Sequence, residues 1–217
     1  MTRARYALYG GTFDPFHLGH LAVARAARDS GLVDEVLVVP AGSPPHRGAT
    51  LAGAEERWCM AVLATVMEPG LRVVRWETER AREGPTFAID TLRLARAALG
   101  WDVDLWWVIG ADALRALGSW HRLVELVQEV RFLVVPRDGE DGAWLASWLE
   151  RELPEVPRDR FVFLPMPRVA VSSTGVRACL ARGGPTQGLL PPLVGAHVAR
   201  YGLYVDRGGG ASQGAAR

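Results

Sequence analysis

Strand-like and helix-like segments alternate along this chain. Short apolar runs without alternation, such as residues 36–39 and the β-rich run 103–109, which is unbroken after Asp104, are typical of strands that are buried on both faces. Longer segments, such as residues 18–27, repeat their apolar residues at helical spacing. By the same criteria we expect further strands at 6–9, 71–76, 132–135 and 161–164, and further helices at 54–67, 87–99 and 143–153.

This alternation predicts the fold class. Continuous apolar strands separated by helices are typical of an α/β protein with a Rossmann-like, doubly wound parallel sheet and helices on both faces. The length of 217 residues suits a single domain, which we expect over residues 1–205, followed by a flexible, Gly- and Ala-rich tail at 206–217. Such sheets bind their ligands in the loops that follow the carboxyl ends of the strands.

The composition narrows the classes of partner. The 25 basic residues nearly balance the 24 acidic ones, for a net charge of +1, whereas non-specific binding of nucleic acid needs a basic surface. The chain has no run of 18 apolar residues, and residues 1–5 lead into a strand rather than a signal peptide. Two cysteines, Cys59 and Cys179, are too few for a disulfide scaffold. We therefore expect a cytoplasmic protein whose partners are neither nucleic acid nor membrane.

The most informative segment is G-G-T-F-D-P-F-H-L-G-H at residues 10–20, between the first expected strand and the first expected helix. Glycines let the backbone approach a ligand closely, and the N–H groups at a helix N-terminus attract anions. His17 and His20 are three residues apart, so they lie on one face of the helix and can both donate to phosphate oxygens. The segment therefore predicts a phosphate site.

Other interpretations of this segment remain open from the residues alone. The two histidines could be zinc ligands, although no third ligand lies nearby in the sequence, or they could cap the helix or be merely buried. The segment is not G-x-G-x-x-G, which disfavours the dinucleotide site of a dehydrogenase. A P-loop is excluded because the chain contains no lysine.

The same segment resembles the signature G-G-T-F-D-P-x-H-x-G-H of the nicotinate-nucleotide adenylyltransferases, within the H-x-G-H nucleotidyltransferase superfamily. The resemblance continues to about Tyr204. It implies adenylyl transfer from ATP to nicotinate mononucleotide, which yields nicotinate adenine dinucleotide and pyrophosphate in NAD biosynthesis. The nearest alternative is the same chemistry on nicotinamide mononucleotide. The alternative from another class is a non-catalytic nucleotide-binding module on the same fold.

Two further segments extend the resemblance on the ATP side. Residues 109–114 resemble I-G-x-D-x-L, in which Asp112 would accept hydrogen bonds from the ribose of ATP, with an N-cap as the alternative role. Residues 171–177 resemble I-S-S-T-x-I-R, a helix start whose Arg177 can bind the ATP phosphates with its two-pronged guanidinium. The resemblance implies that His17, His20 and Arg177 are catalytic. The full implied ATP-binding set is Gly10, Gly11, Thr12, His17, His20, Gly110, Asp112, Ser172, Ser173, Thr174 and Arg177.

The resemblance also implies a site for the mononucleotide. The stretch P-P-H-R ends in Arg47 where the family has lysine, which keeps the positive charge but changes its geometry. Phe87 and Ala88 stand where the family has Tyr and Thr, so two hydroxyl groups are lost and the preference for acid over amide is left open. Trp120 would stack on the pyridine ring, or else belong to the core. The implied mononucleotide-binding set is Phe13, Arg47, Thr86, Phe87, Trp120 and Arg137.

Some matching residues receive no substrate contact from the resemblance. The E-R-x-x-M stretch at residues 56–60 is expected to pack, and Asp90 and Thr91 have capping or pairing as an alternative role. The cofactor that the resemblance implies is Mg²⁺, bridging oxygens of ATP, with no metal site formed by the protein itself. The small-molecule partners are ATP and nicotinate mononucleotide, and the sequence leaves open whether the chain forms a homo-oligomer.

Overall fold

The computed structural model describes residues 3–43, 50–136, 140–167 and 169–205. Within these ranges it contains a six-stranded sheet in the order β3-β2-β1-β4-β5-β6, with every neighbouring pair parallel. The strands are β1 (Ala4–Gly11), β2 (Glu35–Pro40), β3 (Leu71–Val73), β4 (Val103–Gly110), β5 (Val130–Val135) and β6 (Phe161–Phe163). The predicted parallel sheet is confirmed.

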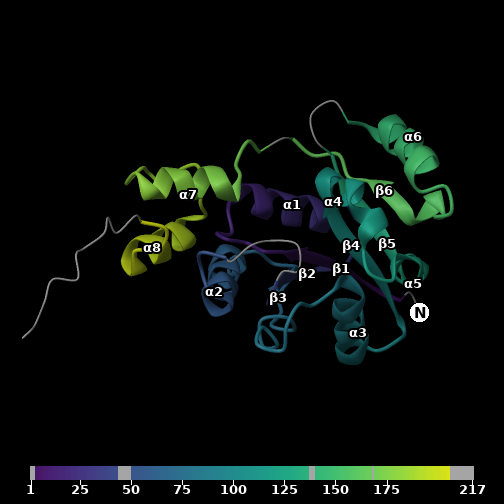
Figure 1. Ribbon diagram of the computed structural model, residues 1–217, viewed down its shortest axis with the longest axis horizontal. Coiled ribbons are helices and arrows are strands. Elements are labelled where there is room, and N and C mark those ends of the chain that lie inside the picture. Colours follow the sequence, from purple (N-terminus) through teal and green to yellow (C-terminus); the bar gives the residue numbers. More distant parts are fainter. Residues whose placement is uncertain (1–2, 44–49, 137–139, 168, 206–217) are drawn as a thin grey trace, which may run out of the picture.

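Helices cover both faces of this sheet. One face packs against α1 (Leu18–Asp29), α2 (Ala54–Thr65), α7 (Ser173–Ala181) and α8 (Pro192–Tyr201). The other packs against α3 (Ala88–Leu99), α4 (Ala111–Arg115), α5 (Leu123–Glu129) and α6 (Gly142–Glu152). Figure 1 shows α7 and α8 together at one end of the molecule and α6 at the other.

The central strands are buried on both sides, as their continuous apolar runs predicted. Leu8 of β1 and Leu37 of β2 face the second group of helices, whereas Ala7 and Val36 face the first, and all four are fully buried. Successive residues of a strand point to opposite faces, so an unbroken apolar run fills two cores at once. The carboxyl ends of β1, β2 and β4 therefore come together at one edge of a rigid sheet.

The structure corrects several expected boundaries and adds three helices. Strand β3 ends at Val73 rather than at residue 76, because its only neighbour, β2, pairs with it over three residues alone. Sequence periodicity did not reveal α4, α5 or α8. The first two have five and seven residues, too few for a helical repeat to show. Helix α8 follows Pro191 and begins with Pro192, and prolines in a sequence are more often signs of a turn.

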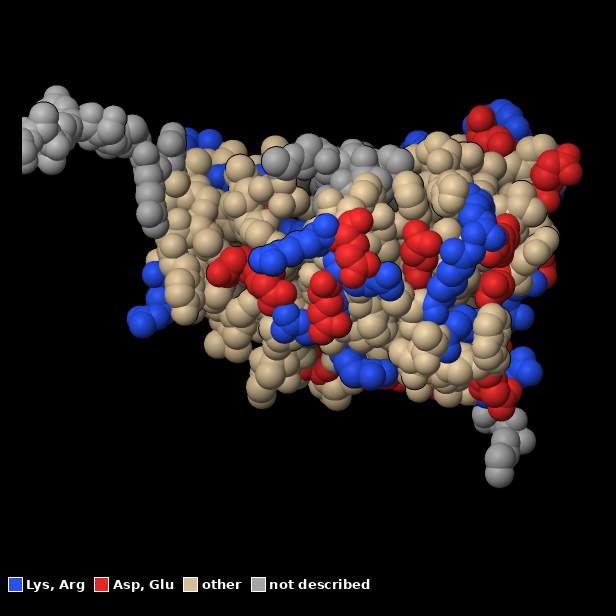
Figure 2. All heavy atoms as spheres, turned by 60° about the horizontal axis from the view of Figure 1, so that its bottom comes forward, with Lys and Arg blue, Asp and Glu red and all other residues tan. Residues whose placement is uncertain are grey.

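Charged side chains are interspersed on the face formed by α2, α3 and the segment between β3 and α3. Figure 2 shows this face, on which arginine and acidic side chains lie next to one another. Several of them form ion pairs, such as Arg75 with Glu55 at 2.5 Å and Arg80 with Glu83 at 2.9 Å. In the part of the chain that the structure describes, no helix has the length and apolar character needed to cross a membrane.

The end of the described chain is tied to the first motif. The Tyr204 hydroxyl donates to Asp14 Oδ1 at 2.7 Å. The buried Asp14 carboxyl also accepts from the backbone N–H groups of Leu51 at 2.9 Å and Ala52 at 3.1 Å. The expected domain end at residue 205 stays a prediction, and residues 206–217 lie outside the described ranges.

We predict that Tyr204→Phe lowers the free energy of unfolding by about 1–3 kcal/mol, because a buried carboxyl loses one of its donors. The measurement is urea denaturation, and Tyr201→Phe is the control because Tyr201 is exposed on α8. Equal stability of wild type and Tyr204→Phe would show that the contact does not hold the C-terminal segment.

Candidate active site

His17 and His20 form a reciprocal pair at the start of α1. His17 is the N-cap residue, and its Nδ1 accepts from the backbone N–H of His20 at 3.3 Å. His20 Nδ1 accepts in turn from the backbone N–H of His17 at 3.2 Å. The two rings stack with their centroids 3.6 Å apart and an interplanar angle of 16°. The capping interpretation of the histidines is therefore confirmed, and it determines their chemistry.

Because both Nδ1 atoms accept hydrogen bonds, a neutral ring carries its proton on Nε2. The Nε2–H groups of two parallel rings can then donate to neighbouring oxygens of one anion. Burial keeps His17 neutral, since it lowers the pKa of the imidazole from 6.5 to about 4. A phosphate that binds here therefore meets a neutral N–H donor. The negative charge of the phosphate would in turn favour protonation of the imidazole.

The lowered pKa of His17 makes stability depend on pH in a defined window. The folded-state pKa lies below the unfolded value of 6.5, so the contribution is complete above pH 6.5 and is lost as the pH falls through about 4. We predict that wild type loses up to about 3 kcal/mol more unfolding free energy than His17→Asn between pH 7 and pH 4. Denaturation curves at pH 7, 5.5 and 4 measure this, and parallel losses in the two proteins would contradict it.

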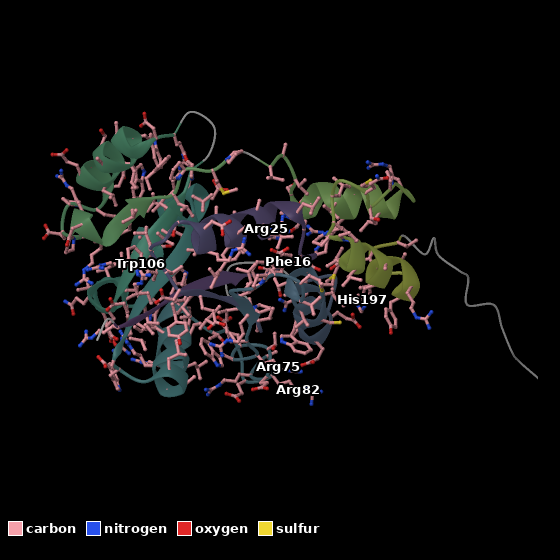
Figure 3. The ribbon with its side chains drawn as sticks, turned by 180° about the vertical axis from the view of Figure 1, so that it is seen from behind. Phe16, Arg25, Arg75, Arg82, Trp106 and His197 are labelled. Carbon is pink, nitrogen blue, oxygen red and sulfur yellow. The ribbon has the colours of Figure 1, made fainter. Side chains whose placement is uncertain are left out.

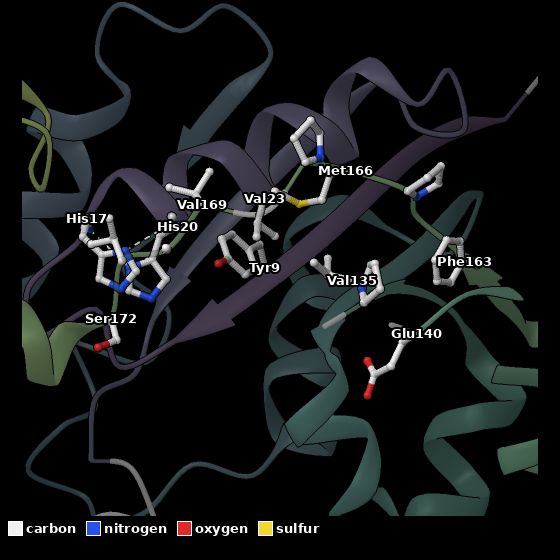
Figure 4. Close-up of a pocket in the computed structure, with 16 residues that line it drawn as sticks. Tyr9, His17, His20, Val23, Val135, Glu140, Phe163, Met166, Val169 and Ser172 are labelled. Atoms are coloured by element: carbon white, nitrogen blue, oxygen red, sulfur yellow. Dashed lines mark hydrogen bonds between the residues drawn. The ribbon is translucent and has the colours of Figure 1, made fainter. Parts of the chain in front are cut away.

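A cavity of about 900 Å³ opens beside the histidine pair. Figure 4 shows His17, His20 and Ser172 at one end of it, Tyr9 along its floor, and Val135 and Glu140 at the other end. Residues 165–167 and 169–172 complete the wall. A volume of this size is in the range that takes a ligand as large as a nucleotide.

The N-terminus of α7 lies across from that of α1. Ser172 is the N-cap of α7, and its Oγ accepts from the backbone N–H of Gly175 at 3.1 Å. The segment before α7 passes very close to α1: a Cβ on Gly19 would lie 3.3 Å from the Val171 carbonyl and 3.0 Å from the His17 ring. Any larger residue between the two histidines would have to displace these neighbours by a few tenths of an ångström, so the close approach favours glycine. Two helix N-termini that favour anions thus border one cavity.

Arg177 is held in place by the first motif. Its Nη1 donates to the Asp14 carbonyl at 2.7 Å, and its Nη2 lies 3.3 Å from Thr174 Oγ1. The neighbouring Ser173 Oγ donates to the Pro15 carbonyl at 3.4 Å. These contacts join the start of α7 to the turn that precedes α1, so the guanidinium and the imidazoles belong to one rigid assembly.

Buried aromatic rings pack against His20 of the histidine pair. Phe13 is 2% exposed and meets His20 edge-on with ring centroids 4.9 Å apart. Phe16 lies 5.4 Å from the same ring, and Figure 3 places it in the interior close to α1. The sequence suggested Phe13 as a mononucleotide contact, but its ring packs against Tyr9, Phe16 and His20, which leaves its backbone for that role.

Asp112, the residue predicted to bind the ribose of ATP, follows the end of β4. Gly110 is the N-cap of α4, so the alternative that Asp112 caps this helix is wrong. Asp112 is exposed, in the first turn of α4, and lies 3.5 Å from Arg115. Arg115 also pairs with Glu140, which lines the cavity. Asp112 thus lies outside the residues that line the cavity. It is connected to the lining residue Glu140 through Arg115.

Two of the predicted mononucleotide residues, Phe87 and Trp120, pack against the core on the other face of the sheet. Phe87 is the N-cap of α3, and its ring lies 4.9 Å from that of His121, to which the sequence assigned no role. Trp120 is half-buried and meets Trp107 edge-on at 6.0 Å, so it is anchored on the core without being enclosed in it. Thr86 lines a separate, smaller cavity. Arg47 and Arg137 lie outside the described residues.

Two residues of the α3 motif have structural partners. The backbone N–H of Phe87 donates to Asp90 Oδ2 at 3.3 Å, which caps the helix. The Thr91 hydroxyl donates to the buried Glu77 carboxyl at 2.5 Å. The alternative that these residues cap or pair is therefore confirmed, with Asp90 as the cap and Thr91 as the paired residue. Among the residues that the structure describes, no group of three or more His, Cys, Asp and Glu side chains could hold a metal ion.

Comparisons with known proteins agree with this geometry. A family model described as cytidylyltransferase-like matches residues 8–179. A relative from Stenotrophomonas maltophilia, named "Probable nicotinate-nucleotide adenylyltransferase", is 43% identical over 90% of this chain and 95% of its own. A relative of the same name from Laribacter hongkongensis is 38% identical over 94% and 96%. The chain belongs to the nicotinate-nucleotide adenylyltransferase family.

Solved structures place the fold in the same group. The nicotinic acid mononucleotide adenylyltransferase of Plasmodium falciparum, complexed with NaAD, aligns with a TM-score of 0.74 over 93% of this chain and 98% of that one. A putative nicotinate-nucleotide adenylyltransferase from Vibrio parahaemolyticus aligns with a TM-score of 0.66 over 94% and 96%. Their sequence identities to this chain are 18% and 16%, so these alignments establish the Rossmann-like fold of the family and nothing finer.

Proposed function

We propose that this chain transfers the adenylyl group of ATP to nicotinate mononucleotide, giving nicotinate adenine dinucleotide and pyrophosphate. Membership in the nicotinate-nucleotide adenylyltransferase family supports this reaction. The single structural observation that carries the proposal is the reciprocal histidine pair at the start of α1, which borders the same cavity as the N-terminus of α7.

The reaction needs no nucleophile from the protein. A phosphate oxygen of the mononucleotide attacks the α-phosphorus of ATP in line and forms a new P–O bond. The bond between the α-phosphorus and the bridging oxygen breaks, and that oxygen leaves with pyrophosphate. Because the attacking group is already an anion, catalysis consists of positioning the two substrates and stabilising the charge of the transition state.

The described residues can share these tasks. His17 and His20 donate from Nε2 to the triphosphate, with His20 most directly at the transition state, and Arg177 holds the departing pyrophosphate. The backbone at the two helix starts adds N–H donors. Beyond these three side chains, the proposed ATP contacts come from Gly10, Gly11, Thr12, Gly110, Asp112, Ser172, Ser173 and Thr174.

The mononucleotide occupies the neighbouring site in this proposal. Its pyridine ring stacks on Trp120, close to Phe87 and Thr86, and Phe13 contributes its backbone. Arg47 and Arg137, outside the described residues, supply positive charge for its phosphate.

Mg²⁺ is proposed as the metal that accompanies ATP. This ion is usually held by substrate phosphates and water rather than by a dedicated protein cage. The donors at the starts of α1 and α7 fit that arrangement, because the imidazoles, the guanidinium and the helix N-termini provide N–H groups for phosphate oxygens. When bound, the ion would neutralise part of the triphosphate charge.

The decisive assay supplies ATP and Mg²⁺ with nicotinate mononucleotide or, in parallel, with nicotinamide mononucleotide. Chromatography identifies the dinucleotide, and a coupled assay measures pyrophosphate. We expect dinucleotide and pyrophosphate in equal amounts and a higher kcat/KM with the acid. Faster reaction with the amide would favour the alternative acceptor, and no product with either mononucleotide would favour a non-catalytic binding module.

A further inference from the structure

Buried polar contacts link the loops that follow β1, β2 and β3, outside the cavity described above. Their centre is Arg57 of α2, which is 1% exposed. Its Nη1 donates to the Thr12 carbonyl at 2.8 Å, and its Nη2 donates to the Gly42 carbonyl at 2.9 Å. Its Nε lies 3.3 Å from the Ala52 carbonyl. One guanidinium therefore joins the turn after β1 to the segment after β2.

Glu77 fixes the same segment from another side. Its buried carboxyl accepts from Thr91 Oγ1 at 2.5 Å and is hydrogen-bonded by the Gly42 backbone. A Cβ on Gly42 would lie 2.1 Å from the Glu77 carbonyl oxygen, so this approach requires glycine. The backbone N–H of Thr91 donates to the Phe87 carbonyl at 3.1 Å. The contacts thus extend from the turn after β1 to the start of α3.

Packing alone does not account for two buried ionisable side chains. Burial lowers the pKa of the Arg57 guanidinium and raises the pKa of Glu77 to about 7, because both charged forms lose water. Apolar side chains of similar volume would fill the same space without this cost. The polar groups instead orient the backbone, because each hydrogen bond fixes the position of one carbonyl or N–H group.

We propose that Arg57 and Glu77 are positioning residues that fix Gly42 and Phe87 and thereby set the affinity for nicotinate mononucleotide. The inference rests on the proposed function, because it takes the Phe87 side of the sheet edge as the mononucleotide site. Neither side chain contacts a substrate, and both act through the backbone of the loops.

The ATP cavity is built from other parts of the chain. Residues of α1, the ends of β1 and β5, and the segment before α7 line it, whereas neither α2 nor the segment between β3 and α3 does. Loss of Glu77, whose hydrogen bonds are with Thr91 and the Gly42 backbone, should therefore weaken binding of the mononucleotide and spare ATP. A purely structural role would weaken both ligands or neither.

The test measures separate dissociation constants for nicotinate mononucleotide and for ATP by calorimetry, in wild type and in Glu77→Gln. Glutamine keeps the size of the side chain but replaces one acceptor oxygen with an NH2 donor, which reduces the acceptor capacity that serves Thr91 Oγ1 and the Gly42 backbone. We expect the Kd of the mononucleotide to rise about 10-fold or more and the Kd of ATP to change less than about 3-fold.

Thr78→Val is the matched control, because Thr78 is buried next to Glu77 but its hydroxyl donates to the Arg75 carbonyl at 3.2 Å. Both Kd values should stay at wild-type levels in this control. Thr91→Val removes the hydroxyl that donates to Glu77 with little change in size, and it should show the same selective loss as Glu77→Gln. Circular dichroism establishes folding, and if Glu77→Gln does not fold, Thr91→Val decides.

Unchanged mononucleotide affinity in the folded variants, or an equal loss for both ligands, overturns the inference while leaving the proposed function intact. Wild-type protein that forms no dinucleotide overturns the proposed function, and the inference with it. The two failures are distinguishable because the first appears only in the variants and the second already in wild type.

Discussion

His20→Ala should lower kcat about 100-fold or more while the protein stays folded. The imidazole Nε2–H is the donor placed closest to the developing charge in the proposed reaction, and removing one such donor typically costs about 2.7–4 kcal/mol of barrier. The loss should appear in kcat more than in the KM for ATP, because a donor that acts in the transition state adds less to ground-state binding. Steady-state kinetics with both substrates measures the two constants.

Two controls separate this catalytic role from helix capping. His20→Glu restores an acceptor for the His17 backbone N–H, as in an ordinary capping box, but supplies no donor. We expect it to fold and to remain inactive. His197→Ala removes a histidine that pairs with Glu56 at 2.7 Å, away from the cavity, and should keep wild-type turnover. Near-normal kcat in a folded His20→Ala or His20→Glu protein would refute the assignment.

Arg177→Met should reduce kcat/KM by about 10²–10³-fold, as expected for the loss of a charged donor to the departing pyrophosphate. The Asp14 carbonyl orients this guanidinium before substrate binds, so its alignment costs little during the reaction. Arg177→Lys retains the charge without the two-pronged geometry and should recover only part of the activity.

The matched control for Arg177 is Arg182→Met, at the C-cap of the same helix, where the side chain is exposed. It should leave kcat/KM within about threefold of wild type. An exposed charge at the C-terminal end of α7 is far from the phosphate site at its N-terminus and is largely screened from it. Activity of Arg177→Met at the level of Arg182→Met would show that the guanidinium has no part in the reaction.

Local patterns in the sequence predicted the fold class and the histidine pair. The run at residues 36–39 identified a central strand because burial on both faces leaves a continuous apolar signature. The spacing of His17 and His20 identified one face of a helix start. The parallel sheet then brings the loops after β1 and β4 together, which is why distant motifs could be assigned to one edge.

Contacts between distant parts of the chain were not predictable in this way. Asp14 and Tyr204 are 190 positions apart, and nothing in either segment indicates the other. Arg57 was expected only to pack, because a sequence does not show that an arginine will be buried against three backbone carbonyls. Phe13 was predicted to contact the mononucleotide because it belongs to the motif at residues 10–20. Its ring instead packs against His20.

The most direct test of the central claim is a crystal structure of the protein with Mg²⁺ and a non-hydrolysable ATP analogue. The account predicts that phosphate oxygens lie about 2.7–3.1 Å from Nε2 of His17, Nε2 of His20 and the guanidinium of Arg177, at the two helix N-termini. A triphosphate bound elsewhere, with those three side chains in contact only with solvent, would contradict it.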